Sequence, residues 1–185
     1  MANNNIFTGD FEVGPKRYWH RGINLAGAAA IAQNNVFFNT DEGTAGKHVI
    51  NLQTASRLNP PTSFSLQKIG FFFNPLALDS DIQTFYDNFV WELTLDDRVF
   101  RDGLLWMAPG GGGMWGNTVR TGDSIMSNGV PDVNAMWAWP EFSLLIPPSV
   151  FIGVKVRTDS TAALTVTNAL RMWCVLDGIR TRGTQ

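Results

Sequence analysis

The stretch Asn88-Phe-Val-Trp-Glu-Leu-Thr-Leu95 decides the fold of this chain. Apolar and polar side chains alternate through it with a period of two residues. Such alternation is typical of a β-strand with one buried face and one face toward water. We therefore expect Trp91 and Leu93 to be buried, and Glu92 and Thr94 to be wetter.

The sequence on either side continues the β pattern. Asp96-Asp97 is typical of a tight turn, and Arg98-Val-Phe-Arg-Asp-Gly103 is expected to return as the second strand of a hairpin. Similar short segments bring the total to about eight strands. We place them at residues 35–39, 47–53, 64–73, 142–146, 150–157, 164–167 and 170–176. The chain is therefore predicted to be all-β, an antiparallel two-sheet sandwich.

The first 34 residues lack this pattern. We expect an extended N-terminal arm over residues 1–34, followed by a single domain over residues 35–185. Within the arm, the segment NLAGAAAIAQN at residues 24–34 has the only composition that favours a helix. Asn24 can cap such a helix, whereas Gly27 weakens it. A short helix and a partner-dependent extended arm both remain open for this segment.

Composition excludes several classes of protein. Only 16% of the 185 residues are charged, against about 25% in an ordinary soluble protein, so a coiled coil is excluded. The formal net charge is −2 and no basic face is visible along the sequence, so we expect no direct binding of nucleic acid. The N-terminal residues contain neither a secretory signal nor a segment long and apolar enough to span a membrane, so no transmembrane segment is expected.

No residue pattern indicates catalysis, a metal or a cofactor. His20 and His48 lie far apart, outside any zinc-ligand spacing, and the single cysteine, Cys174, sits in an apolar run typical of a buried strand. The glycines of Gly111-x-Gly113-x-x-Gly116 follow Pro109 rather than a strand and precede no helical sequence, unlike a dinucleotide-binding loop. Asp79-Ser-Asp81 fits a polar loop with an Asx turn better than a cation site. We therefore predict a protein that is not an enzyme and binds no cofactor.

The aromatic residues carry the strongest functional signal. Trp91, Trp106 and Trp173 fall on expected strands and are assigned to the core. Residues 109–140 form a long segment rich in Gly, Pro and Trp, where burial in the core is less automatic. Its large apolar side chains can serve a protein interface, a local core or a platform for stacking sugars, and we favour the interface. The interface candidates are Trp115, Trp137, Trp139, Met114 and Met136.

The order of these features resembles a known class of protein. The pieces that carry the resemblance are Trp91–Asp97 with Val99–Gly103, the Pro147-Pro148 kink, and the closing Leu176-Asp-Gly-Ile-Arg-Thr-Arg182. Together they resemble small single jelly-roll virion proteins of bacteriophages, either capsid or capsid-associated. The resemblance implies a jelly-roll sandwich and a non-enzymatic structural role. It also implies a homo-oligomer, trimer or pentamer, that contacts other virion proteins and is made in the host cytoplasm.

Two other functions remain open at this point. Jelly rolls also occur in lectins and cupins, so the fold alone does not decide the function. The first alternative is a lectin-like carbohydrate-binding module that stacks sugars on exposed tryptophans. The second is a cupin-type enzyme, against which the distance between His20 and His48 argues.

Overall fold

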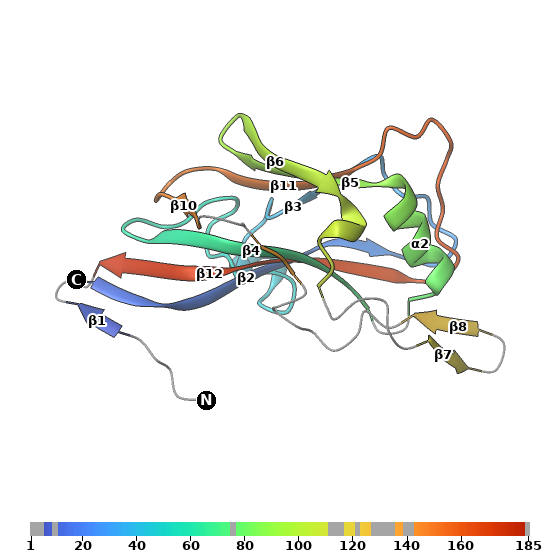
Figure 1. Cartoon of the computed structure of the whole chain (residues 1–185), viewed down its shortest axis with the longest axis horizontal. Coiled ribbons are helices and arrows are strands. Elements are labelled where there is room, and N and C mark those ends of the chain that lie inside the picture. The colour runs from blue at the N-terminus through green and yellow to red at the C-terminus, as the bar shows by residue number, and fades with distance from the viewer. Residues whose placement is uncertain are drawn as a thin grey trace.

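Two antiparallel β-sheets packed face to face make up the computed structural model of this chain (Figure 1). It describes residues 6–8, 11–74, 77–110, 117–120, 123–126, 136–138 and 143–183. The first sheet has the order β1 (Ile6–Thr8), β2 (Phe11–Leu25), β12 (Leu170–Gly183), β4 (Ser63–Phe73) and β10 (Leu144–Ile146), with β9 (Trp137–Ala138) also on β4. The second sheet has the order β3 (Asn34–Phe37), β11 (Ile152–Arg157), β5 (Val90–Leu95) and β6 (Arg98–Leu104). The predicted all-β sandwich is confirmed.

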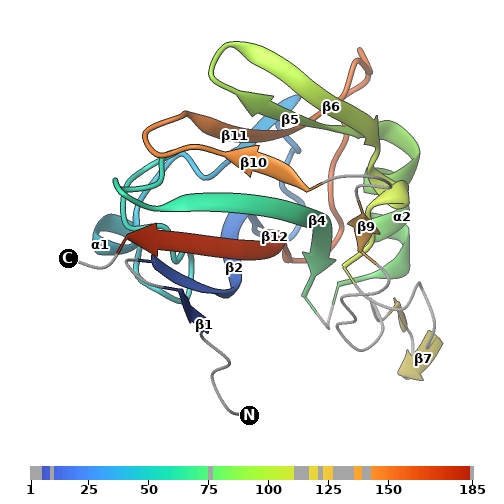
Figure 2. The same ribbon diagram turned by 60° about the vertical axis from the view of Figure 1, so that its left-hand side comes forward.

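Short elements complete the two layers. A separate hairpin pairs β7 (Asn117–Arg120) with β8 (Asp123–Met126). The helical elements are α1 (Glu42–Ala45), α2 (Asp79–Asn88) and the 3-10 turn η1 (Leu105–Met107). Turning the molecule, Figure 2 shows α1 near the C-terminal end of β12, whereas α2 lies toward the opposite end of the sandwich. None of the helices in the described part of the chain has the length and hydropathy that crossing a membrane requires.

Strand β5 follows three of the four exposures that its sequence predicts. Trp91 and Leu93 are fully buried, and Glu92 on the opposite face is half-buried. The expectation for Thr94 is wrong, because this residue is only 9% exposed. Its hydroxyl donates a hydrogen bond of 3.0 Å to the carbonyl of Gly153, so the polar side chain is satisfied within the neighbouring strand.

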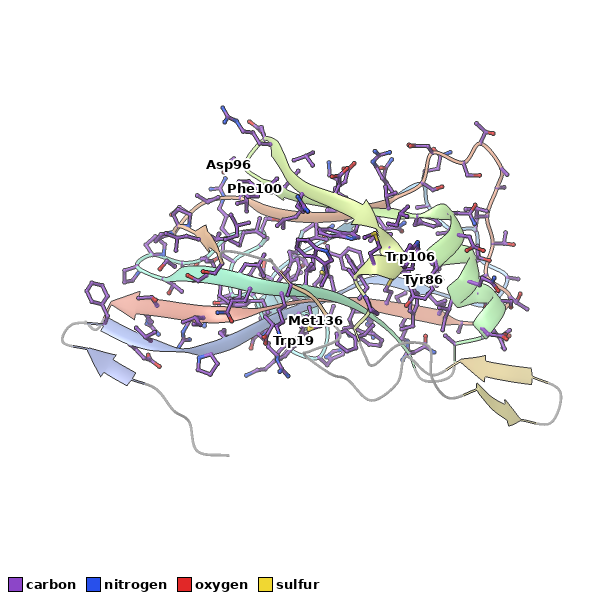
Figure 3. The ribbon with its side chains drawn as sticks, in the orientation of Figure 1. Trp19, Tyr86, Asp96, Phe100, Trp106 and Met136 are labelled. Carbon is purple, nitrogen blue, oxygen red and sulfur yellow. The ribbon has the colours of Figure 1, made fainter. Side chains whose placement is uncertain are left out.

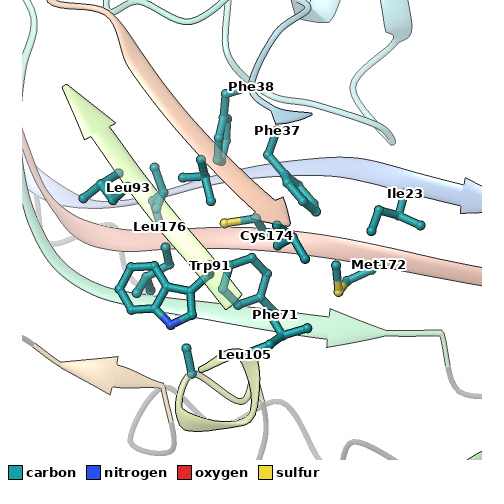
Figure 4. Packing of buried hydrophobic residues seen from close by; sticks show 14 of the residues in the cluster. Ile23, Phe37, Phe38, Phe71, Trp91, Leu93, Leu105, Met172, Cys174 and Leu176 are labelled. Atoms are coloured by element: carbon teal, nitrogen blue, oxygen red, sulfur yellow. The ribbon is translucent and has the colours of Figure 1, made fainter. Parts of the chain in front are cut away.

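Aromatic side chains fill the space between the sheets (Figure 4). The ring of Phe71 lies 5.9 Å from that of Phe37 and 6.4 Å from that of Trp91, centroid to centroid. Glycines opposite these rings make the close packing possible. A Cβ at Gly22 would lie 2.5 Å from a ring carbon of Phe37, and one at Gly103 would lie 3.1 Å from Nε1 of Trp91.

An N-terminal arm over residues 1–34 is not confirmed. Residues 11–25 form β2, which lies inside the first sheet between β1 and β12. The helix considered for residues 24–34 is wrong, since residues 26–33 form a loop paired with the loop before β12. The amide of Ile31 donates to the carbonyl of Leu164 at 2.9 Å, and the amide of Val166 donates to the carbonyl of Ala29 at 3.0 Å. Hydrogen bonds to the neighbouring loop therefore outweigh the helix propensity of the alanine-rich segment.

Strand boundaries differ from expectation at three more places. The closing strand β12 continues to Gly183, beyond its expected end at Leu176. Residues 47–53 and 164–167 are not strands, and each contributes only one isolated bridge, at Ile50 and Thr165. The expected hairpin of β5 and β6 around Asp96-Asp97 is confirmed.

The polar loop expected at Asp79-Ser-Asp81 is the first turn of α2. This helix buries Ile82, Phe85 and Tyr86 against the sandwich. The carboxylate of Asp81 is buried as well, and it accepts backbone N–H groups of Thr167 at 2.7 Å and Asn168 at 2.9 Å. Asp81 thereby fastens the loop before β12 to the helix.

His20 is a second buried polar side chain with a structural role. Its Nδ1 accepts the backbone N–H of Phe38 at 2.6 Å, at a position where Phe38 has a positive φ of 65°. Burial, together with the neighbouring Arg21 guanidinium, lowers the pKa of His20 to about 4. The imidazole is therefore neutral near pH 7 and acts as an acceptor.

We predict that Asp81→Asn destabilises the fold by about 2 kcal/mol, because an amide cannot replace both charge-assisted hydrogen bonds to the loop. The measurement is the free energy of unfolding in urea. Asp87→Asn, at an exposed position of the same helix, is the matched control and should leave this free energy unchanged. Equal losses in the two variants would contradict the role given to Asp81.

We also predict a loss of stability in mild acid that depends on His20. The folded pKa of about 4 lies below the ordinary value of 6.5, so the unfolded chain takes up a proton first as the pH falls below 6.5. Stability that is present above pH 6.5 is then lost toward pH 4, by on the order of 2 kcal/mol between pH 7 and pH 5. Unfolding free energies measured across this range should be flatter in His20→Asn. The control His48→Asn, at an exposed position, should keep the wild-type slope.

Candidate functional site

The structure describes two of the five interface candidates, and both pack against or within the core. Met136 is only 4% exposed and therefore buried within this chain. Trp137 is partly buried, with its ring 5.6 Å from that of Trp91 and 5.2 Å from the guanidinium carbon of Arg101. The remaining candidates, Trp115, Trp139 and Met114, lie outside the described residues. The interface role of all five stays a prediction.

The tryptophans assigned to strands also divide. Trp91 is buried as expected, and Trp173 on β12 is half-buried. The core assignment of Trp106 is wrong, because this residue is 54% exposed and lies on η1 rather than on a strand. The turn into η1 directs Leu105 into the core and leaves the next side chain outside.

Exposed apolar side chains gather along β6 and η1. They are 45% to 57% exposed. We call this set the β6 edge surface, and it consists of Val99, Phe100, Leu104, Trp106 and Met107. Figure 3 shows Phe100 toward the tip of the β5–β6 hairpin and Trp106 beyond the other end of β6. Because β6 is the outer strand of the second sheet, these side chains stand beside a row of backbone groups that has no neighbouring strand in the sheet.

A bulge interrupts β6 at Phe100, toward the hairpin end of this surface. In the pairing with β5, Leu93 faces Arg101 and Thr94 faces Val99, so Phe100 has no partner across the strands. A bulge of this kind bends the strand and increases its twist, which disfavours the addition of a regular further strand. The β6 edge surface is therefore suited to contact through side chains rather than to extension of the sheet.

A second feature is a cavity of about 370 Å³ at the end of the sandwich where β12 finishes. Its floor comes from β2 and β12, and its wall from the long connection between β3 and β4, which contains α1. In the pairing of β2 with β12, Lys16 faces Gly178 and Arg180 faces Gly14. Two long cationic side chains thus alternate with two glycines, and this leaves open space between them. We call this cavity the basic pocket.

Five basic side chains and one carboxylate line the basic pocket. The carboxylate is Glu42, and the basic residues are Lys16, Lys47, Arg57, Arg180 and Arg182. No basic face is visible in the sequence because these residues are scattered from position 16 to position 182. Only the pairing of the second and last strands, with the β3–β4 connection folded beside them, brings them together.

Hydrogen bonds and local charges fix part of the pocket. The indole N–H of Trp19 donates to the carbonyl of Lys47 at 3.1 Å and holds the loop backbone in place. The guanidinium of Arg180 pairs with Glu12 at 3.0 Å. Burial lowers the pKa of Lys16 from its ordinary value, and the charges of Arg180 and Lys47 add to this lowering. The basic pocket therefore holds cations that repel one another.

The single cysteine, Cys174, and one of the two histidines, His20, are buried in the core. Burial raises the pKa of the Cys174 thiol well above its usual range. Its neighbour across the strand pair is His20, which is occupied by the amide of Phe38. No group of three or more His, Cys, Asp or Glu side chains gathers around a common point within the described ranges.

Comparison with protein families, with curated proteins and with solved structures finds no match to this chain. The two surfaces are therefore interpreted from their own geometry and chemistry.

Proposed function

We propose that this chain is a non-enzymatic structural subunit of a virus particle, with a jelly-roll fold, which assembles with further copies of itself. The observation that carries the assembly is the β6 edge surface. A set of apolar side chains about half exposed on an outer strand is a liability in an isolated chain, and native proteins usually cover such strands. A second copy of the chain would cover it.

The strand order supports the jelly-roll part of this proposal. The first sheet contains β2-β12-β4-β10, and the second contains β3-β11-β5-β6. Among these eight strands, counted along the chain, the first lies beside the last and the third beside the sixth. In the other sheet, the second lies beside the seventh and the fourth beside the fifth. Nested antiparallel pairs shared between two sheets are what two Greek keys wrapped into a jelly roll produce.

The contact between copies is expected to be one of packed side chains. Phe100 and Trp106 are aromatic, and aromatic residues together with Met are enriched where proteins meet. Complete burial of such a side chain is worth about 1.5–3 kcal/mol relative to full exposure, so burial of the exposed halves of several side chains contributes usefully to association. Placement of the protein in the virion, and contact with other virion proteins, rest on the resemblance to phage jelly rolls.

The test is the mass of the protein in solution. We expect the wild-type chain to form a defined oligomer, a trimer or pentamer, by light scattering after size exclusion. Phe100→Ser with Trp106→Ser should weaken this assembly by at least about tenfold, because the variant removes the apolar anchors of the contact. Thermal unfolding should change little, since both side chains are already half in water.

Leu145→Ser is the matched control, because Leu145 is 60% exposed but lies on β10 of the other sheet. This variant should assemble like the wild type. A wild-type chain that stays monomeric at the highest concentration reached would overturn the proposal. If such a monomer also bound glycans and lost that binding in Trp106→Ser, it would be the lectin-like module instead.

A further inference from the structure

The basic pocket holds a charge that the rest of the chain does not explain. Its lining has five cations against one carboxylate, whereas the whole chain has a formal net charge of −2. The chain outside the pocket is therefore acidic. A strong local excess of one sign of charge in a concave site attracts ions of the opposite sign.

Most of the pocket cations have no carboxylate partner among the residues that the structure describes. Among the described residues, ion pairs within 4.0 Å include Arg180 with Glu12, but none involves the other four cations that line the pocket. By contrast, Arg17, on the opposite face of β2, is paired with Asp177 at 2.6 Å. The ammonium of Lys16 lies 5.6 Å from the centre of the Tyr18 ring, which is a weak substitute for a carboxylate. On β2, the outward Arg17 thus has a carboxylate partner within 4.0 Å, whereas Lys16 has none among the described residues.

The three pocket cations on strands, Lys16, Arg180 and Arg182, continue the rows of β2 and β12 whose earlier members face the core. Every second residue of β12 faces the core, from Leu170 through Leu176 to Gly178, and the next two in the same row are Arg180 and Arg182. The same row of β2 changes from Tyr18 to Lys16 at the matching place. On both strands, the side chains of this row are therefore apolar within the core and basic beyond it. Side chains that served only to keep the protein in solution would more simply face outward.

We propose that the basic pocket binds a phosphate or sulfate group carried by a small molecule. Guanidinium groups bind the oxygens of such anions through paired hydrogen bonds, and ammonium groups add charge. Counting Glu42 and the Glu12 that pairs with Arg180, an excess of three positive charges remains, which favours a polyvalent anion over a single carboxylate. A volume of about 370 Å³ lies within the range of small-molecule pockets, of roughly 300–1,000 Å³.

The same charges argue against a nucleic acid as the ligand. A nucleic-acid strand needs a continuous basic track, because each bound phosphate releases counterions along the strand. Here the basic residues converge in one cavity, and the chain beyond it is acidic. A single charged group that enters the cavity fits this distribution better than a polymer that runs past it.

The experiment is a calorimetric titration at low ionic strength, where charge interactions are least screened. The probes are pyrophosphate, a sulfated disaccharide and a single-stranded DNA oligonucleotide. We expect saturable binding of pyrophosphate or of the disaccharide. The tighter of the two shows whether the pocket prefers a phosphate or a sulfate group. Lys47→Gln with Arg57→Gln should weaken that binding by at least about tenfold. Both positions are exposed and lie in the loop, so the fold should tolerate the variant.

The matched control is Lys155→Gln with Arg98→Gln, which removes two exposed cations from the second sheet. It has the same net charge as the test variant and should bind like the wild type. Arg182→Gln gives a second test from the strand side of the pocket. Absence of binding to the wild type, or equal weakening in test and control variants, would overturn the proposal. So would tighter binding of the oligonucleotide that survives in the test variant. Because no probe result depends on the oligomeric state, the outcome is independent of the assembly proposed above.

Discussion

The position of β12, the last strand, between β2 and β4 is the constraint on which the rest of the structure depends. A central strand has its backbone groups paired on both sides, and its inward side chains supply the floor of the core. Because β2 lies near the start of the chain, this sheet cannot close until nearly the whole chain is present. Contacts between such distant residues make folding slow and strongly cooperative.

Aromatic packing against the second sheet is the next consequence of that arrangement. Phe71 on β4 touches rings from both β3 and β5, and so joins the two layers. Glycines such as Gly22 and Gly103 allow these rings to approach the backbone.

The two ends of the sandwich are closed differently. One end is closed by α2, with Asp81 holding the loop before β12, and the other by the β3–β4 connection with its cavity. The β6 edge surface and the basic pocket share no residue, so the proposed assembly and the proposed ligand binding use separate parts of the molecule.

The sequence predicted most of the strands, because alternation in β5 and β11 is a local property that burial of one face produces. It missed α2, although Ile82, Phe85, Tyr86 and Phe89 have helical spacing, since the acidic start at Asp79 suggested a loop. The exposure of Trp106 depends on how η1 turns after β6, which periodicity does not record. The basic pocket was beyond prediction for a different reason. The register that sets Lys16 beside Arg180 is a long-range property, and no spacing in the sequence encodes it.

Cys174 gives the molecule an internal reporter of its own opening. It is the one cysteine of the sequence, lies on β12 and is fully buried in the core between the sheets. A thiol reagent can reach it only after the two sheets separate, whereas fraying of the loops leaves it covered. The rate at which the Cys174 thiol is modified under native conditions therefore reports how often the sandwich opens. No label has to be introduced.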